Sequence, residues 1–182
     1  MLKNNPASCP KGGRVKIKLL PGLVFLALIF TLSFQGASVA GSDDKAAKAA
    51  PDFTLNMPGG GTCSLAGYKG KENVILMFWT INGAYCSFEL EGMRDKYSEV
   101  KKNNFEIIAI NIKEESAKVK DFVLKEKLTF PVILDTDGKV AKMYSVRSLP
   151  VFLIINKEGQ IKWRGYTFPT EYLKLVNKPN TP

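Results

Sequence analysis

The residues of this 182-residue chain that can do chemistry most directly are its cysteines. There are three, Cys9, Cys63 and Cys86, and the chain contains no histidine. Without histidine, Ser-His-Asp and Cys-His catalysis, His-ligated zinc sites and His-ligated haem are all excluded. Only two cysteines follow residue 40, and two thiols cannot build a four-thiolate metal site. The sequence therefore predicts thiol-disulfide chemistry with no metal and no cofactor.

Cys86 stands near the end of a recognisable sequence motif. Residues 78–89 are Phe-Trp-Thr-Ile-Asn-Gly-Ala-Tyr-Cys-Ser-Phe-Glu. This segment resembles the F-W-A-T-W-C-x-x-C-x-x-E segment of the TlpA/ResA-type thioredoxin-like proteins, which are related to the redoxins and to the AhpC/TSA proteins. The resemblance implies that Cys86 matches the second, resolving cysteine, while Gly83 stands where the first, attacking cysteine would be. Cys86 then cannot close a disulfide across the helix turn, so the usual two-thiol cycle is not available.

The same resemblance implies roles for residues near Cys86 and farther along the chain. Glu89 matches the family's carboxylate, which can help to move a proton at the active-site thiol, so Cys86 and Glu89 are the predicted catalytic residues. The Leu149-Pro150 step resembles the cis-proline that faces the thiols in thioredoxin-like folds, where an extended substrate can pair with the exposed backbone. Ser148 and Val151 depart from the Gly and Thr usual at those places, so no substrate preference follows. The residues expected to contact a substrate are Trp79, Gly83, Ala84, Tyr85, Arg147, Leu149 and Pro150.

Opposing effects act on the acidity of the Cys86 thiol. Helix N-terminal amides lower the pKa of a thiol, and a nearby Arg147 would do the same. Burial and the negative charge of Glu89 raise the pKa. Because Cys86 shares an apolar helix stripe with Leu90 and Met93, we expect burial to dominate. The alternative to a reactive thiol is an inert buried one that fills the core.

Cys63 also has two interpretations. It shares a face of a predicted hairpin with Leu65, which favours a small core residue. An extracytoplasmic compartment is oxidising, so the alternative is a Cys63–Cys86 disulfide, which needs Cα atoms within about 7 Å of one another.

The elements around the motif follow an α/β pattern. Residues 74–79 and 105–112 are continuous apolar runs, typical of strands buried on both faces, and the residues between them have helical spacing. This strand-helix-strand unit predicts parallel strands. The expected elements after it are a helix at 116–127, a strand at 132–134, a short helix at 139–144, antiparallel strands at 151–155 and 160–165, and a closing helix at 170–177. With a hairpin at 53–65 in front, the order matches a thioredoxin fold over residues 52–177, with a mixed central sheet flanked by helices.

The first 40 residues are typical of a secretory signal. They contain five basic residues and no acidic one, followed by an apolar run and then by Ser38 and Ala40 ahead of the predicted cut after Ala40. We predict a flexible linker at 41–51, a thioredoxin-like domain at 52–178 and a tail at 179–182. The alternative is an uncleaved membrane anchor at 19–39, although its 16 mostly apolar residues are fewer than the about 20 of a spanning helix. Either arrangement predicts a periplasmic or secreted domain in a bacterium.

Charge helps to define the expected partners. Loss of residues 1–40 leaves 21 basic and 17 acidic residues, so the net charge falls from +9 to +4. The remaining lysines form no run of five or more, which is typical of a solvated surface and argues against nucleic-acid binding. We expect a thiol- or disulfide-bearing protein or a small thiol as partner, and a membrane only if the N-terminal segment is retained.

Three functions follow from these observations. The first is a thiol-disulfide oxidoreductase that acts through Cys86 alone, by mixed disulfides with a protein or a small thiol. The second is a non-catalytic module that binds an extended segment of a partner beside Pro150. The third, a redoxin-type peroxidase, is disfavoured. Peroxiredoxins set a Thr or Ser three residues and a Pro seven residues before the peroxidatic cysteine, where this chain has Gly83 and Trp79.

Overall fold

A seven-stranded mixed sheet organises the computed structural model, which describes residue 9 and residues 48–177. The strand order is β2-β1-β5-β4-β3-β6-β7. Strand β4 runs parallel to both β3 and β5, β6 is antiparallel to β3, and β7 is antiparallel to β6. Strand β1 is antiparallel to both β2 and β5. The strands are β1 (Thr54–Asn56), β2 (Thr62–Ser64), β3 (Asn73–Trp79), β4 (Phe105–Ile112), β5 (Val132–Asp135), β6 (Val151–Ile155) and β7 (Ile161–Gly165).

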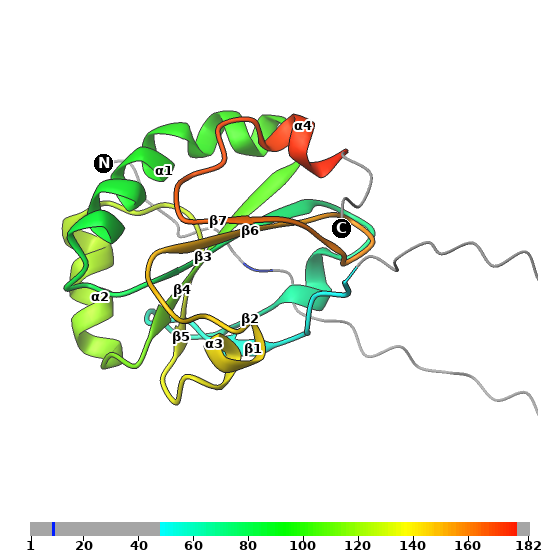
Figure 1. Ribbon diagram of the computed structural model, residues 1–182. Helices are drawn as coiled ribbons and strands as arrows, with labels where there is room; N and C mark the ends of the chain where they lie inside the picture. The colour runs from blue at the N-terminus through cyan, green and yellow to red at the C-terminus, as the bar shows by residue number, and fades with distance from the viewer. Residues whose placement is uncertain (1–8, 10–47, 178–182) are drawn as a thin grey trace, which may run out of the picture.

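Helices cover both faces of the sheet (Figure 1). The 3-10 helix η1 (Leu65–Tyr68) and α3 (Lys139–Met143) pack on one face. Helices α1 (Ala84–Lys102), α2 (Ser116–Lys125) and α4 (Tyr172–Val176) pack on the other. Because successive strand residues point to opposite faces, Met77 of β3 packs in the layer under α1 while Phe78 packs in the layer under α3. This two-sided burial explains why β3 and β4 are apolar along nearly their whole length.

The structure confirms the predicted α/β fold and most of its element boundaries. The parallel strands on either side of α1 and the antiparallel strands β6 and β7 are all present. The predicted stripe of α1 faces the core, with Cys86, Leu90 and Met93 buried. Helices α2 and α4 are shorter than predicted.

The start of the chain departs from the prediction where it is described. The backbone N–H of Ala50 donates to the carbonyl of Gly159 at 2.8 Å, and Ala49 forms a bridge with Gln160. The last residues of the predicted linker therefore pack against the turn between β6 and β7. The predicted signal, its cut after Ala40 and the tail at 179–182 lie outside the described residues.

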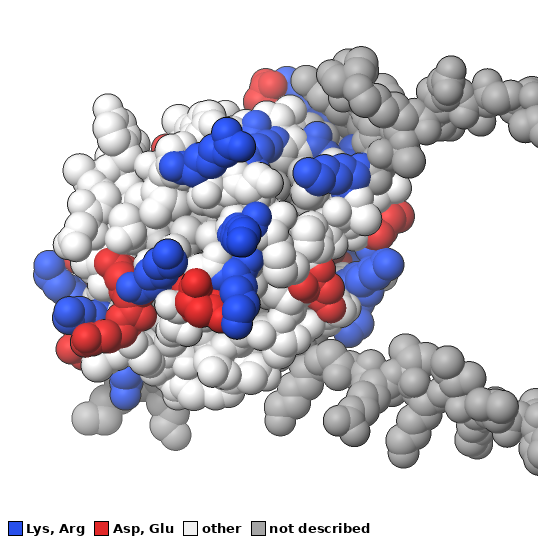
Figure 2. All heavy atoms as spheres, turned by 60° about the horizontal axis from the view of Figure 1, so that its bottom comes forward, with Lys and Arg blue, Asp and Glu red and all other residues white. Residues whose placement is uncertain are grey.

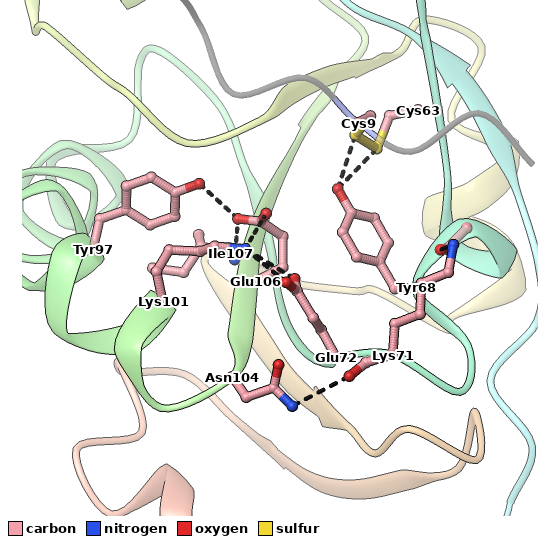
Figure 3. A network of polar contacts seen from close by, with 11 residues as sticks. Cys9, Cys63, Tyr68, Lys71, Glu72, Tyr97, Lys101, Asn104, Glu106 and Ile107 are labelled. Atoms are coloured by element: carbon pink, nitrogen blue, oxygen red, sulfur yellow. Dashed lines mark hydrogen bonds and ion pairs between the residues drawn. A yellow bond between two sulfur atoms is a disulfide. The ribbon is translucent and has the colours of Figure 1, made fainter.

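A buried polar cluster lies near the amino ends of β3 and β4 (Figure 3). The Glu106 carboxylate accepts hydrogen bonds from the Tyr97 hydroxyl at 2.8 Å and from Lys101 Nζ at 3.1 Å. Lys101 also forms an ion pair with Glu72 at 2.9 Å. Burial raises the pKa of the Glu106 carboxyl. Because these charges satisfy one another, the cluster stabilises the end of the sheet opposite to the start of α1.

The structure corrects the alternative interpretation of Cys63, a Cys63–Cys86 disulfide. Cys63 is bonded to Cys9, with a Cα–Cα distance of 5.1 Å, and Cys86 is a free thiol. The Tyr68 hydroxyl lies 3.0 Å from Cys9 Sγ beside this bond (Figure 3). Cys63 packs in the layer under η1 and α3, whereas Cys86 packs in the layer under α1. The sheet separates the two thiols, so they cannot bond.

The surface carries charges of both signs. On the face shown in Figure 2, acidic side chains lie among the basic ones rather than leaving a surface of one sign. Within residues 48–177, no helix is both long enough and apolar enough to cross a membrane.

Candidate functional site

The candidate site lies where β3 ends and α1 begins. A tight turn follows Trp79, and the backbone N–H of Gly83 donates to the carbonyl of Thr80 at 3.4 Å. Gly83 is the N-cap residue of α1, in an extended conformation, and its carbonyl accepts from the N–H of Ser87 at 3.1 Å. The helix begins at Ala84, so Cys86 lies in its first turn and points inward.

The Cys86 thiol lies close to the place where a side chain of residue 83 would begin. A Cβ atom placed on Gly83 would lie 2.8 Å from Cys86 Sγ and 3.4 Å from the Thr80 methyl carbon. An unbonded carbon and sulfur need about 3.5 Å or more. In a disulfide, however, the Cβ of one cysteine lies about 3 Å from the sulfur of the other. The added Cβ would also lie 3.2 Å from Cys86 Cβ, somewhat less than the about 3.5–4.5 Å between the Cβ atoms of a disulfide. The thiol therefore lies near the place where it would be if it were bonded to a cysteine at position 83.

Glu114 binds the turn beside the thiol, a role that no motif in the sequence indicated. Its carboxylate accepts from the Thr80 hydroxyl at 2.9 Å and from the Ile81 N–H at 3.0 Å. It also accepts from the Asn111 side-chain amide. The signal that could have found Glu114 is its position just after β4, because parallel β3 and β4 end at the same edge of the sheet.

The pKa of the Cys86 thiol is raised above its ordinary value. Burial is the largest cause, and the negative charges of Glu114 and Glu89 add to it. A hydrogen bond with the Thr80 backbone acts in the opposite direction. The expectation that burial dominates is therefore confirmed, and carboxylates rather than Arg147 are the charges that act on the thiol.

A Glu114→Gln change should make Cys86 more reactive. Removing the negative charge lowers the pKa of the thiol, while the glutamine oxygen still accepts hydrogen bonds from the turn. We expect about threefold faster alkylation by iodoacetamide at pH 8, and a rate-against-pH curve displaced to lower pH. The matched control is Glu115→Gln, since Glu115 is exposed and pairs with Lys118 instead. Superimposable pH curves for Glu114→Gln and the native chain would contradict the role assigned to this carboxylate.

Glu89 is nearly buried and has a structural partner. Its carboxylate accepts from the backbone N–H of Phe168 at 3.0 Å, and Lys96 Nζ lies 5.2 Å from the centre of the Phe168 ring. Glu89 therefore attaches the segment between β7 and α4 to the first turns of α1. Its role in moving a proton at Cys86 stays a prediction.

The segment before β6 lies beside the turn of the candidate site. Phe78 of β3 pairs with Val151 of β6, which brings residues 148–150 next to the end of β3. The Leu149–Pro150 peptide bond is cis. Leu149 packs against the apolar layer that contains Cys86, whereas Arg147 is exposed.

Arg164 fixes the start of this segment, a role that the sequence did not indicate. Its guanidinium donates to the carbonyl of Tyr144 at 2.7 Å and to that of Ser145 at 3.1 Å. The carbonyls belong to the end of α3, so β7 holds the chain in place just before residues 147–150.

The expected substrate-contacting residues differ in exposure. Ala84 and Tyr85 are exposed and Gly83 is partly exposed, so the structure leaves them accessible at the start of α1. Trp79 is 0% exposed and packs with its ring centre 5.2 Å from that of Phe122, and Pro150 is also buried, so contact of these two side chains with a substrate stays a prediction. Trp79 supports the site from the core. Phe88, which was not predicted, is 72% exposed one helical turn after Tyr85.

A thioredoxin fold with one buried thiol in the first turn of α1, beside a cis-proline segment, defines a thioredoxin-like protein of the thiol-disulfide oxidoreductase type. Residues 46–164 match the model of the AhpC/TSA family. The chain belongs to this family.

Named relatives agree with this class. The chain is 34% identical over 141 residues to the thiol-disulfide oxidoreductase ResA of Bacillus subtilis (strain 168), covering 76% of this chain and 78% of that protein. ResA of Bacillus thuringiensis subsp. konkukian (strain 97-27) is 30% identical over 151 residues, covering 83% and 87%.

Solved structures share the fold. StoA from Bacillus subtilis superposes with a TM-score of 0.60 at 26% identity, covering 71% of this chain and 98% of StoA. A putative thiol:disulfide interchange protein DsbE from Chlorobium tepidum superposes with a TM-score of 0.63 at 23% identity, covering 71% and 91%.

Proposed function

We propose that this chain is an extracytoplasmic thiol-disulfide exchange protein that acts through Cys86 alone. The observation that supports the proposal most directly is that Cys86 Sγ lies close to the side-chain position of residue 83, where a second thiol would have to be. Among the described residues Cys86 is the free cysteine, and the Cys63 sulfur lies across the sheet. A second thiol for each cycle must therefore come from another molecule.

The exchange takes two balanced steps. In the first, the Cys86 thiolate attacks a disulfide R–S–S–R′, a Cys86–S–S–R bond forms, and the R′ thiolate leaves and takes up a proton. In the second, an external thiolate R″–S⁻ attacks the R sulfur, which releases R–S–S–R″ and restores the Cys86 thiolate. The net result replaces R′ by R″ in the disulfide with no net oxidation or reduction, and Cys86 is unchanged at the end.

Location and processing form part of the proposal. We propose export with cleavage after Ala40, which removes Cys9 and leaves Cys63 as a buried thiol. The Cys9–Cys63 bond and this cleavage cannot both occur in one mature chain of 142 residues. A spanning anchor at 19–39 would also separate the two sulfurs, because it would place them on opposite sides of the membrane.

Intact mass of the protein from its native compartment tests these statements together. We expect a chain that begins at Gly41, carries an adduct on Cys86 after incubation with glutathione disulfide, and loses that adduct on reduction. A Cys86→Ser variant should form no adduct at this position. A native Cys86 that takes up no small thiol and no reagent would overturn the exchange proposal, and a full-length mass would overturn the processing.

The second candidate is a non-catalytic module that binds an extended segment of a partner protein. It is favoured by the 1% exposure of Cys86 and by the exposed Tyr85 and Phe88 at the start of α1. In that case Cys86→Ser would keep full function, whereas changes at Leu149 and Pro150 would abolish it. Complementation with the serine variant therefore separates the two candidates.

A further inference from the structure

A pocket of about 320 Å³ lies apart from the site around Cys86. It is bordered by α2, by the segment between α2 and β5, and by the turn between β1 and β2. Its lining is mostly apolar and includes the buried side chains of Leu128, Phe130 and Val132. Ligand pockets in proteins begin at about 300 Å³ and combine an apolar lining with a few polar groups. This pocket therefore has the size and the lining of a site for one small molecule.

The charges that line the pocket have one sign. Among the described residues of the lining, Lys120 and Lys127 are the charged ones and none is acidic. Within the part of the chain that the structure describes, neither ammonium group has a hydrogen bond or an ion pair. The neighbouring Lys118 and Lys125, which do not line the pocket, both pair with carboxylates. An apolar molecule that also carries a negative charge would complement both parts of the lining.

One face of α2 and its end carries both the cations and the apolar surface. Residues 120, 123, 124 and 127 follow the i, i+3, i+4, i+7 spacing of a single helix face. Val123 is partly buried against the core, whereas Leu124 is 67% exposed and lies along the chain between the two lysines. An amphipathic ligand would cover this leucine and neutralise its charged neighbours.

The backbone at Lys127 favours a role for its side chain. Its φ of 54° lies in the left-handed region, where glycine is usual at the end of a helix because it has no side chain to clash. The end of α2 is capped without the lysine side chain, since the N–H of Leu128 donates to the carbonyl of Val123 at 3.1 Å. The carbonyl of Glu126 accepts from Arg94 at 3.0 Å. The ammonium group of Lys127 is therefore not needed to end the helix and is available to a ligand.

We propose that this pocket binds a small amphipathic monocarboxylate. Its apolar body packs against Phe130 and Val132, and its carboxylate pairs with Lys120 and Lys127. The site goes beyond the proposed function and does not depend on Cys86. A volume near the lower end of the range for ligand pockets fits a short alkyl or aryl body rather than a long lipid chain.

Octanoate is a suitable probe, and 1-octanol and octylammonium test its head group at the same chain length. In an NMR titration of the chain, octanoate should shift the amide signals of residues 57–60 and 120–130. It should bind at least about fivefold more tightly than octanol, because two lysines each add a partly exposed ion pair. Octylammonium should bind less tightly than octanol. Raising the salt concentration should weaken binding of octanoate and not of octanol.

Variants of the two lysines test the contact with the carboxylate. Lys127→Gly should weaken octanoate binding about threefold without lowering the melting temperature, since glycine adopts the left-handed conformation without a steric penalty. Lys120→Gln should have a similar effect, and the double variant should lose about tenfold. The matched control is Lys125→Gln, which lies outside the pocket and should leave the affinity unchanged within about 1.5-fold. The affinity for octanol should be the same in every variant.

Several results would overturn this assignment. Octanoate that shifts no amide of the pocket, or that binds no more tightly than octanol, contradicts it. An equal loss of affinity in Lys125→Gln and Lys127→Gly also contradicts it. A chain that dimerises by light scattering and becomes monomeric in Leu124→Glu would show that a second copy covers the pocket instead. The reactivity of Cys86 bears only on the proposed function, so the two proposals fail separately.

Discussion

A Gly83→Cys variant should form a disulfide between the introduced thiol and Cys86 on oxidation and, when reduced, exchange with small disulfides at least about tenfold faster than the native chain at pH 7. The position is already spaced for the bond, because the Cβ of residue 83 would lie 2.8 Å from Cys86 Sγ. The backbone of residue 83 has φ −89° and ψ 109°, which any residue can adopt. The Cβ atoms of residues 83 and 86 would be 3.2 Å apart, so the bond needs a shift of only about a few tenths of an ångström.

The introduced thiol would differ from Cys86 in its environment. Residue 83 is partly exposed and is the N-cap of α1, where the helix N-terminal amides stabilise a thiolate and lower its pKa. Cys86 is buried, and its pKa is raised by burial and by two carboxylates. The introduced thiol would thus attack and Cys86 would resolve, which completes the two-thiol cycle within one chain.

Mass spectrometry and an exchange assay measure this result. Oxidation should remove two hydrogens from Gly83→Cys, and tryptic mapping should place this loss in the peptide of residues 72–94, which contains both thiols. The matched control is Gly92→Cys, which lies in open space six residues along α1 from Cys86, so the thiols of residues 86 and 92 should stay separate. A Gly83→Cys variant in which the thiols of residues 83 and 86 do not bond to one another under oxidising conditions would contradict the geometry.

Local sequence patterns explain which parts of the fold could be predicted. The helical spacing of the apolar residues in α1 predicted that Cys86 points inward, and the structure buries it beside Leu90 and Met93. The apolar run at β3 fixed that strand to within one residue of its bounds. Both patterns depend on the periodicity of a single element, so one sequence is enough to show them.

The features that escaped prediction all depend on contacts between distant elements. Glu114 reaches the turn at Thr80 because β3 and β4 end together, and Arg164 reaches the end of α3 across β6. Trp79 was expected to contact a substrate because it adjoins the motif, but its side chain is 0% exposed in the layer under α1. Cys9 is bonded to Cys63 over a separation of 54 residues, which no local pattern indicates.

A buried carboxylate in β5 also helps to position the cis-proline segment, residues 145–150. Asp135 ends β5 and is 0% exposed. Its two oxygens accept from the backbone N–H groups of Val140 at 3.1 Å and Ala141 at 2.7 Å, in the first turn of α3. Helix α3 leads directly to residues 145–150, so the position of that segment depends on this carboxylate.

Asp135→Ala should lower the free energy of unfolding by about 3 kcal/mol, because it leaves two buried N–H groups without an acceptor. For a domain of this size the melting temperature should fall by about 10 °C, as measured by circular dichroism. The matched control is Asp137→Ala in the same turn, where the exposed carboxylate pairs with Lys139 and should contribute less than about 1 kcal/mol. Amide hydrogen exchange at residues 145–149 should also accelerate in Asp135→Ala and not in Asp137→Ala, because only the first change releases α3. Equal melting temperatures for the two variants would mean that α3 and the cis-proline segment are held by other contacts, with Arg164 the next to test.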